Sequence, residues 1–135
     1  MNAVDIQAAL GSVGELKIAK QTTSDDVRAA MKMLGNFNQC IMGLVYFLGS
    51  TPWERHPDDE LLQILEGEVD VTILSDSGVD EVTLYTGSIF IVPRGLWHKQ
   101  HSYKGVKLLF ITSQEGNEAS EAEDPRTNSS VEIAK

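Results

Sequence analysis

The sequence predicts an all-β, antiparallel fold, and three observations point to it. From residue 37 to 113, short runs rich in β-branched and aromatic residues alternate with Gly or Asp/Ser clusters. The run EVDVTILS (68–75) alternates apolar and polar side chains, as a half-buried antiparallel strand does. No long helical pattern lies between these runs, which disfavours a parallel sheet. The evenly spaced strands therefore favour a closed or sandwiched antiparallel barrel.

The chain divides into three parts by composition. Residues 1–36 mix short apolar patches with polar breaks and form a helical or extended N-terminal appendage. Residues 37–113 carry the strand pattern of the barrel. Residues 114–135 contain six acidic and two basic residues and almost no large apolar side chain. We expect this last part to be an acidic, flexible tail.

One helix is predicted in the N-terminal part, over the stretch TTSDDVRAAMKMLGN (22–36). Thr23 or Ser24 can cap its N-terminus, two aspartates follow in the first turn, and Gly35 is a plausible stop. The apolar residues of this stretch are spaced as one helical stripe: Val27, Ala30, Met31 and Leu34.

The composition limits which partners the protein can bind and which cell compartment it is expected in. At 135 residues the chain is one domain with a single core. A net charge of −9 argues against nucleic acid and anionic membranes as partners. No apolar run reaches the roughly 18 residues of a membrane span, and the N-terminus lacks a signal-peptide pattern. The single cysteine, Cys40, fits a reducing environment, so we expect a cytoplasmic protein.

Ionisable residues crowd ahead of an apolar run in PWERHPDDELLQILEG (52–67). Glu54 and His56 are two positions apart, so in an extended chain both point to the same side. Glu60 begins the next strand, after a Pro-Asp-Asp corner. This stretch is either a solvated turn or the wall of a cavity.

A second stretch, GSIFIVPRGLWHKQHS (87–102), contains a tight turn, and His98 opens the strand that follows it. Two imidazoles, His56 and His98, and the Glu60 carboxylate can converge from adjoining strands on one side of a divalent metal. Such an arrangement leaves coordination positions open for a substrate or for oxygen.

The two stretches resemble the cupin superfamily, whose motifs are G-x5-H-x-H-x3,4-E-x6-G and G-x5-P-x-G-x2-H-x3-N. The first motif is matched at His56, Glu60 and Gly67, but Glu54 stands at its first histidine and its leading glycine is one place off. Ser102 replaces the asparagine of the second motif, which is otherwise matched at Gly87, Pro93, Gly95 and His98. The resemblance covers about residues 38–113 and is greatest to small cupins of the mannose-6-phosphate isomerase-like group.

This resemblance implies an RmlC-like jelly-roll barrel. It also implies one divalent transition metal (iron, manganese, zinc or nickel) bound by His56, Glu60 and His98. Glu54 is either a fourth, oxygen ligand, or a base or supporting residue beside a three-ligand site. Both motifs skip Asp58 and Asp59, so we expect these two to be solvated turn residues.

Two function classes follow from the resemblance. The first is a mononuclear metal enzyme acting on a small polar metabolite in the barrel, of dioxygenase, isomerase or lyase type. The second is a non-catalytic module that binds a small molecule or a metal. The interpretation leans towards the enzyme, although the missing histidine adds weight to the module.

The run CIMGLVYFLG (40–49) is apolar on both faces, more than one barrel wall needs. Either the N-terminal segment or a second copy of the chain covers its outer face. We expect a two-fold homodimer, as the resemblance also implies, with an interface that includes residues between about 16 and 48 and leaves the acidic tail outside. By alternation, one of two sets faces outwards: Ile41, Gly43, Val45 and Phe47, or Met42, Leu44, Tyr46 and Leu48.

Overall fold

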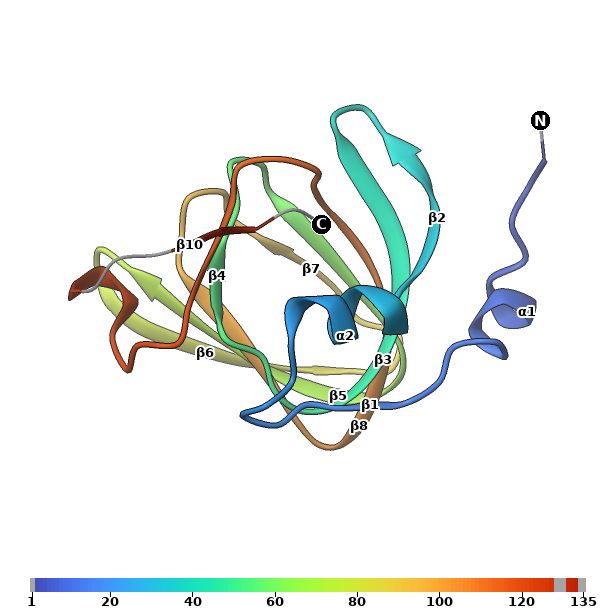
Figure 1. The fold of residues 1–135 in the computed structure, drawn as a ribbon, viewed down its shortest axis with the longest axis horizontal. Helices are drawn as coiled ribbons and strands as arrows, with labels where there is room; N and C mark the ends of the chain where they lie inside the picture. Colours follow the sequence, from blue (N-terminus) through green and yellow to red (C-terminus); the bar gives the residue numbers. More distant parts are fainter. Residues whose placement is uncertain (1, 128–130, 134–135) are drawn as a thin grey trace.

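The computed structural model describes residues 2–127 and 131–133, and most of these lie in strands (Figure 1). In chain order the elements are α1 (Ile6–Leu10), β1 (Leu16–Lys17), α2 (Ser24–Ala30), β2 (Lys32–Phe37), β3 (Cys40–Ser50), β4 (Trp53–Arg55), β5 (Glu60–Ser75), β6 (Gly78–Tyr85), β7 (Ile89–Val92), β8 (His98–Ser113), β9 (Asn117–Ser120), the 3-10 helix η1 (Pro125–Thr127) and β10 (Val131–Ile133).

Strands β5 and β8 are the frame of the barrel. Each is 16 residues long, and they pair antiparallel from Leu61 opposite Ile111 to Ile73 opposite His98. Strand β3 pairs antiparallel with β8, while β6 and β7 pair antiparallel with β5. Within the described residues, the one parallel pair is β1 with β3. The prediction of an all-β barrel with a short helical N-terminal segment is confirmed.

The two long strands bend together at a pair of glycines. Gly67 and Gly105 have φ angles of +88° and +109°, in the region that favours glycine. A Cβ atom on Gly67 would lie 2.3 Å from the carbonyl oxygen of Gly105, so the close approach of the two backbones requires glycine. As a result, β5 pairs with β7 before the bend and with β6 after it.

Two apolar clusters settle which face of β3 points inwards. Val45 and Phe47 belong to the barrel interior, whereas Leu44 belongs to a second cluster on the outer face, with Leu10 of α1. Of the two alternating sets, therefore, the one containing Leu44 faces outwards. Helix α1 covers part of this face, and Leu44 is fully buried there, which is worth about 2 kcal/mol.

Helix α2 is shorter than predicted. It begins as expected, because Thr23 and Asp26 form a capping box in which each side chain accepts a hydrogen bond from the other's backbone N–H. It ends at Ala30 rather than near Gly35, since Met31 is extended and residues 32–37 pair with β3 as strand β2. The β2–β3 hydrogen bonds override the helical spacing of the apolar residues.

The segment from residue 114 was expected to fold weakly, but much of it is built into the barrel. Strand β9 pairs antiparallel with β4, with Trp53 opposite Ser120 and Arg55 opposite Glu118. Asn117 at its start is fully buried. Backbone pairing with the edge of β4 supplies the stabilisation that the polar side chains do not. Residues 128–130, 134 and 135 of the predicted tail lie outside the described residues.

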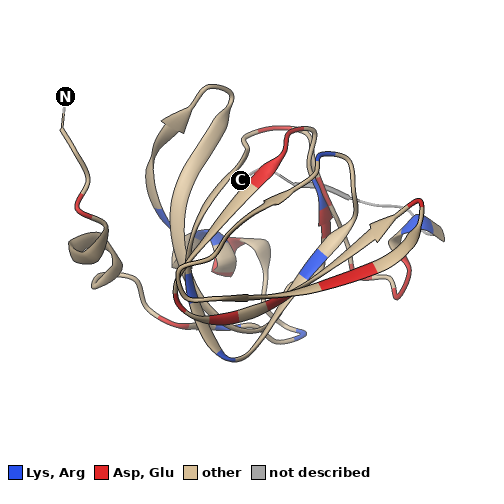
Figure 2. Cartoon of the chain, turned by 180° about the vertical axis from the view of Figure 1, so that it is seen from behind, with Lys and Arg blue, Asp and Glu red and all other residues tan. Residues whose placement is uncertain are grey.

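Acidic residues outnumber basic ones by 20 to 11, and Figure 2 shows the basic residues scattered rather than gathered on one surface. This distribution offers no continuous basic surface to a polyanion. In the described ranges, no helix has the length and apolar character needed to cross a membrane.

Candidate metal centre

The four predicted site residues meet where three strands come together. Glu54 on β4 is the antiparallel partner of His98 on β8, and His56 follows directly after β4. Glu60 is the first residue of β5. His56, Glu60 and His98 are 3%, 4% and 2% exposed, so these ionisable side chains lie inside the barrel and not on its surface.

The turns of the two motifs are tied to each other by backbone and side-chain hydrogen bonds. The Gly95 N–H donates to the carbonyl oxygen of His56 at 2.9 Å. The Arg94 N–H donates to Asp59 Oδ1 at 2.9 Å. These bonds hold the loop that carries His56 against the loop that leads to His98, so the two imidazoles are positioned by one hydrogen-bonded unit.

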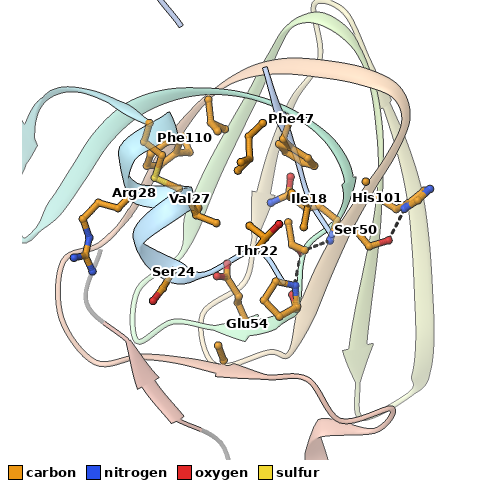
Figure 3. A pocket seen from close by; sticks show the side chains of 18 of the residues that line it. Ile18, Thr22, Ser24, Val27, Arg28, Phe47, Ser50, Glu54, His101 and Phe110 are labelled. Carbon is orange, nitrogen blue, oxygen red and sulfur yellow. Dashed lines mark hydrogen bonds between the residues drawn. The ribbon is translucent and has the colours of Figure 1, made fainter. Parts of the chain in front are cut away.

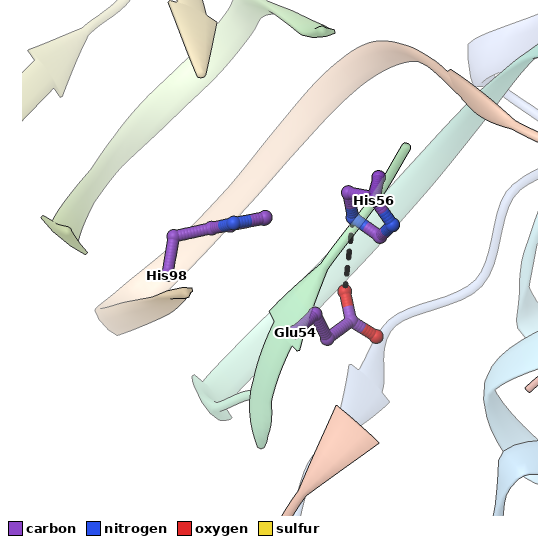
Figure 4. A group of neighbouring side chains, drawn as sticks. All are labelled: Glu54, His56 and His98. Atoms are coloured by element: carbon purple, nitrogen blue, oxygen red, sulfur yellow. Dashed lines mark ion pairs between the residues drawn. The ribbon is translucent and has the colours of Figure 1, made fainter. Parts of the chain in front are cut away.

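The ligand atoms of the cluster lie within reach of a single ion. One nitrogen of each histidine and one oxygen of Glu54 all lie within 4.8 Å of one another (Figure 4). Glu60 Oε1 lies 3.1 Å from His98 Nε2 and 3.5 Å from His56 Nε2. The structure thus brings all four predicted residues together, since Glu54 Oε1 also lies 3.9 Å from His56 Nε2.

Hydrogen bonds hold both histidines in the form that turns Nε2 towards the cluster. His56 Nδ1–H donates to Asn117 Oδ1 at 2.6 Å, and Asn117 Nδ2 donates to the Ser113 carbonyl oxygen at 2.8 Å, which fixes the amide. His98 Nδ1–H donates to the Leu96 carbonyl oxygen at 3.1 Å. Both acceptor oxygens lack a proton, so each Nδ1 must carry one, and the neutral His56 ring keeps a lone pair on Nε2. His98 Nε2 instead makes a 3.1 Å hydrogen bond to Glu60 Oε1, so an ion bound there would take the place of the proton in that bond.

One buried nitrogen atom, His56 Nε2, indicates that the cluster fits a divalent cation. His56 Nε2 is buried and has no hydrogen-bond partner among the residues that the structure describes, although the two glutamates lie near it. A buried polar atom without a partner costs about 1–3 kcal/mol. A cation held by two imidazole nitrogens and carboxylate oxygens would offset that cost, and this donor set suits iron, manganese, zinc or nickel.

Electrostatics at the cluster also favour a cation. Burial by itself would lower the pKa of His98, but the hydrogen bond and charge of Glu60 and the charge of Glu54 outweigh it and raise the pKa above its usual value. The carboxylates therefore create a negative potential inside the barrel that attracts positive charge, whether a proton or a metal.

Asp58 differs from the expected solvated turn residue. Its carboxylate accepts hydrogen bonds from Gln39 Nε2 and Ser113 Oγ, both at 2.8 Å. These bonds, that of Gln39 first, lower the pKa of Asp58 below its usual value. Asp58 therefore ties the loop after β4 to the turn before β3 and to the end of β8, whereas Asp59 is exposed, as expected.

A cavity of about 630 Å³ opens from the cluster into the barrel (Figure 3). Glu54 and Glu60 form part of its wall at the cluster. Helix α2 covers it on another side, and Figure 3 shows Val27 of this helix pointing into the cavity. Most of the remaining interior wall is apolar: Val45, Phe47, Leu62, Leu108 and Phe110.

Two residues of this site were not predicted from the sequence. Asn117 holds His56, but it lies in the segment that composition marked as a tail. Gln100, two residues after His98, lines the cavity. Its position on the same face of β8 as His98 was the available signal, because alternate residues of a strand share a face.

Comparison with known proteins agrees with this geometry. Residues 48–112 match the family described as "Cupin domain". An uncharacterized Bacillus subtilis protein, YdbB, is 30% identical over 71 residues, which are 52% of this chain and 60% of that protein. The match thus spans less than two thirds of the relative's length.

Solved structures share the fold. A Neisseria meningitidis protein superposes with a TM-score of 0.62 at 21% identity, covering 83% of this chain and 99% of its own. A cupin-2 domain protein from Shewanella frigidimarina superposes with a TM-score of 0.54 at 23% identity, covering 70% of this chain and 95% of its own. Oxalate oxidase in complex with the substrate analogue glycolate superposes with a TM-score of 0.53 at 25% identity, covering 65% of this chain and 53% of its own. The chain has a cupin fold with a candidate His/Glu metal site, and these matches support its place in the cupin superfamily.

Proposed function

We propose that the chain is a mononuclear metal-dependent cupin enzyme that acts on a small molecule held in the barrel cavity. His56, His98 and Glu60 hold one divalent transition metal, and Glu54 supplies the fourth ligand in place of the usual histidine. The observation that carries this proposal is the buried His56 Nε2, which has no hydrogen-bond partner among the described residues and lies beside a second imidazole and two carboxylates.

A metal bound there would supply Lewis-acid chemistry or the activation of oxygen. The chain itself positions the groups around it. Asn117 and the Leu96 carbonyl fix the two imidazoles, and the apolar barrel wall excludes water from the reacting molecule. The Glu54 side chain is 17% exposed at the cavity, so the alternative to its ligand role is that its carboxylate accepts a proton from that molecule. Likeness to oxalate oxidase supports an oxygen-dependent oxidation over isomerase or lyase chemistry.

A non-catalytic module that binds a small molecule is the second candidate. Glu54 at the position of the first motif histidine favours it, because the ligand set then departs from that of the cupin motif. Under this alternative the metal and the cavity ligand bind, but no product forms. The likeness to mannose-6-phosphate isomerase-like cupins stays a prediction.

Metal analysis of the full chain, purified without a histidine tag, tests the site. After supplementation with iron(II), manganese, zinc or nickel, we expect elemental analysis to find about one ion per chain. His98→Ala should remove most of it and leave the barrel folded. The matched control is His101→Ala, on the same strand but outside the cluster, which should stay loaded. Equal loading of wild type and His98→Ala contradicts the site.

We also propose a two-fold homodimer. Among the described residues, Phe37 of β2 is 58% exposed, and Ile89 and Ile91 of β7 are 64% and 48% exposed, although α1 covers the middle of the apolar outer face. Exposed apolar residues on edge strands invite pairing. Light scattering coupled to size exclusion should give about twice the chain mass of 14.8 kDa, and a monomer mass at micromolar concentration would refute the dimer.

A further inference from the structure

Gln100 presents an unused hydrogen-bond acceptor inside the barrel. The residue is 8% exposed, lines the cavity, and its Oε1 has no hydrogen-bond partner within residues 2–127 and 131–133. Its backbone is fully used, since its N–H donates to Thr51 Oγ1 and its carbonyl oxygen accepts from the Thr51 N–H, both at 2.9 Å. The strand is therefore fixed while the side-chain carbonyl is left for something else.

A buried amide oxygen without a partner is rare in proteins and destabilises the fold. Gln100 follows His98 by two residues, so both side chains point from β8 into the barrel. The two Cα atoms are about 6.8 Å apart along an extended strand. A molecule of a few bonds' length can therefore lie next to the His/Glu cluster and donate a hydrogen bond to Gln100 at the same time.

The rest of the cavity disfavours anions, and its apolar wall makes any charged group costly to bury. Its interior wall is apolar and includes the rings of Phe47 and Phe110. Glu54 and Glu60 line it at the cluster, and two carboxylates repel an anion. Of the two basic residues at its outer side, Lys20 is exposed, and Arg28 pairs with Asp25 while its guanidinium points away from the cavity in Figure 3.

We propose that the cavity takes a neutral, mainly apolar molecule with an aromatic or branched body and one hydroxyl group, which donates its hydrogen bond to Gln100 Oε1. Gln100 is then a specificity-determining residue, and α2 covers the apolar body of the ligand. The inference names the substrate class of the proposed function, but the Gln100 contact itself requires no metal.

A pair of probes that differ by one hydroxyl tests this, 4-methylphenol and toluene, with affinities measured by ligand-observed NMR on the full chain. In the presence of chelator, we expect the wild type to bind 4-methylphenol about fivefold to tenfold tighter than toluene, the value of one hydrogen bond in a buried site. Gln100→Leu should bring the two affinities to within about twofold, with toluene binding retained. The matched control, Gln63→Leu on the outer face of β5, should keep the preference.

Melting temperatures of the same variants separate ligand binding from a structural role. Because Gln100 Oε1 makes no hydrogen bond with the described residues, Gln100→Leu should melt at or above the wild-type temperature. The proposal is overturned if the wild type binds the two probes equally or binds neither at millimolar concentration. It is equally overturned if Gln100→Leu keeps the preference, or if mannose 6-phosphate displaces 4-methylphenol.

Failure of this inference and failure of the proposed function look different. A hydroxyl preference that depends on Gln100, in a chain that loads no metal, supports the cavity inference and refutes the metal enzyme. One ion per chain without any preference for the hydroxylated probe supports the metal site and refutes the cavity inference. Repeating the probe series on metal-loaded chain shows whether the ion adds affinity for the hydroxylated probe.

Discussion

Asn117 Oδ1 accepts a 2.6 Å hydrogen bond from His56 Nδ1, and this bond joins strand β9 to the candidate metal centre. The amide is itself held by its donation to the Ser113 carbonyl oxygen. The proton on His56 Nδ1, and with it the lone pair on Nε2, is therefore determined by a residue that comes more than 60 positions later in the chain.

Asn117→Leu should weaken metal binding about tenfold to a hundredfold, because the imidazole of His56 loses the acceptor that orients it. Asn117→Asp should keep most of the affinity, since a carboxylate oxygen still accepts from Nδ1–H. Competition against a chelating dye measures both variants, and Asn36→Ala, an exposed position on β2, is the control. Equal affinities for the Leu and Asp variants would contradict a positioning role.

Glu54→His restores the histidine of the cupin motif and exchanges an oxygen donor for a nitrogen donor. We expect the metal preference to move towards nickel, copper and zinc, which imidazole suits, and away from manganese. A competition series over these ions measures the shift, with Glu121→His at the outer side of the cavity as the control. Unchanged relative affinities would mean that Glu54 is not a ligand.

The lowered pKa of Asp58 predicts that the stability of the fold depends on pH. Hydrogen bonds from Gln39 and Ser113 lower its folded-state pKa, so the ionised form is favoured in the native protein. This stabilisation is fully present above about pH 4, near the usual aspartate pKa, and is lost as the pH falls through the lower folded-state value. Asp58→Asn should therefore melt below the wild type at pH 7, and the gap should narrow below about pH 4.

Melting curves between pH 7 and pH 3 measure this gap. Asp76→Asn, at an exposed position after β5, is the control and should follow the wild type throughout. A gap between Asp58→Asn and wild type that stays constant down to pH 3 would show that the carboxylate charge is not responsible.

Thr23→Ala removes one half of the capping box that starts α2. Loss of an N-cap of this kind costs about 1 kcal/mol, and because α2 has no fully buried residue, that cost should fall on the helix rather than on the barrel. We expect faster amide hydrogen exchange at residues 26–30 with little change in β5 and β8. Ser24→Ala is the neighbouring control. Unchanged exchange in α2 would show that packing over the cavity, and not the cap, holds the helix.

Much of the barrel and most of the cluster could be predicted because their signals are local. Strand alternation and glycines mark the barrel, and the spacing of His56, Glu60 and His98 follows from where β4, β5 and β8 begin and end. The predictions for two segments were wrong because pairing between strands overrides the local pattern. The helical pattern of residues 31–34 gives way to pairing between β2 and β3, and β9 forms because the edge of β4 is available to it.

Asn117 and Gln100 were not predicted from the sequence for a similar reason. Asn117 is polar and lies among acidic residues, so composition alone assigns it to solvent. Only the ladder between β4 and β9 brings it to His56. Gln100 is one polar residue in an alternating strand, and its meaning depends on the cavity that it faces.

Strand β9 has a consequence for where this protein can be cut. The part recognised as a cupin ends at residue 112, and all four candidate ligands precede that point. A chain shortened after Ser113 would keep every ligand and the full length of β8, yet it would expose the edge of β4 and leave the His56 ring free to turn over. The smallest unit that keeps His56 in place is thus longer than the part recognised as a cupin, and a shortened chain meant to test metal binding has to include residues 117–120.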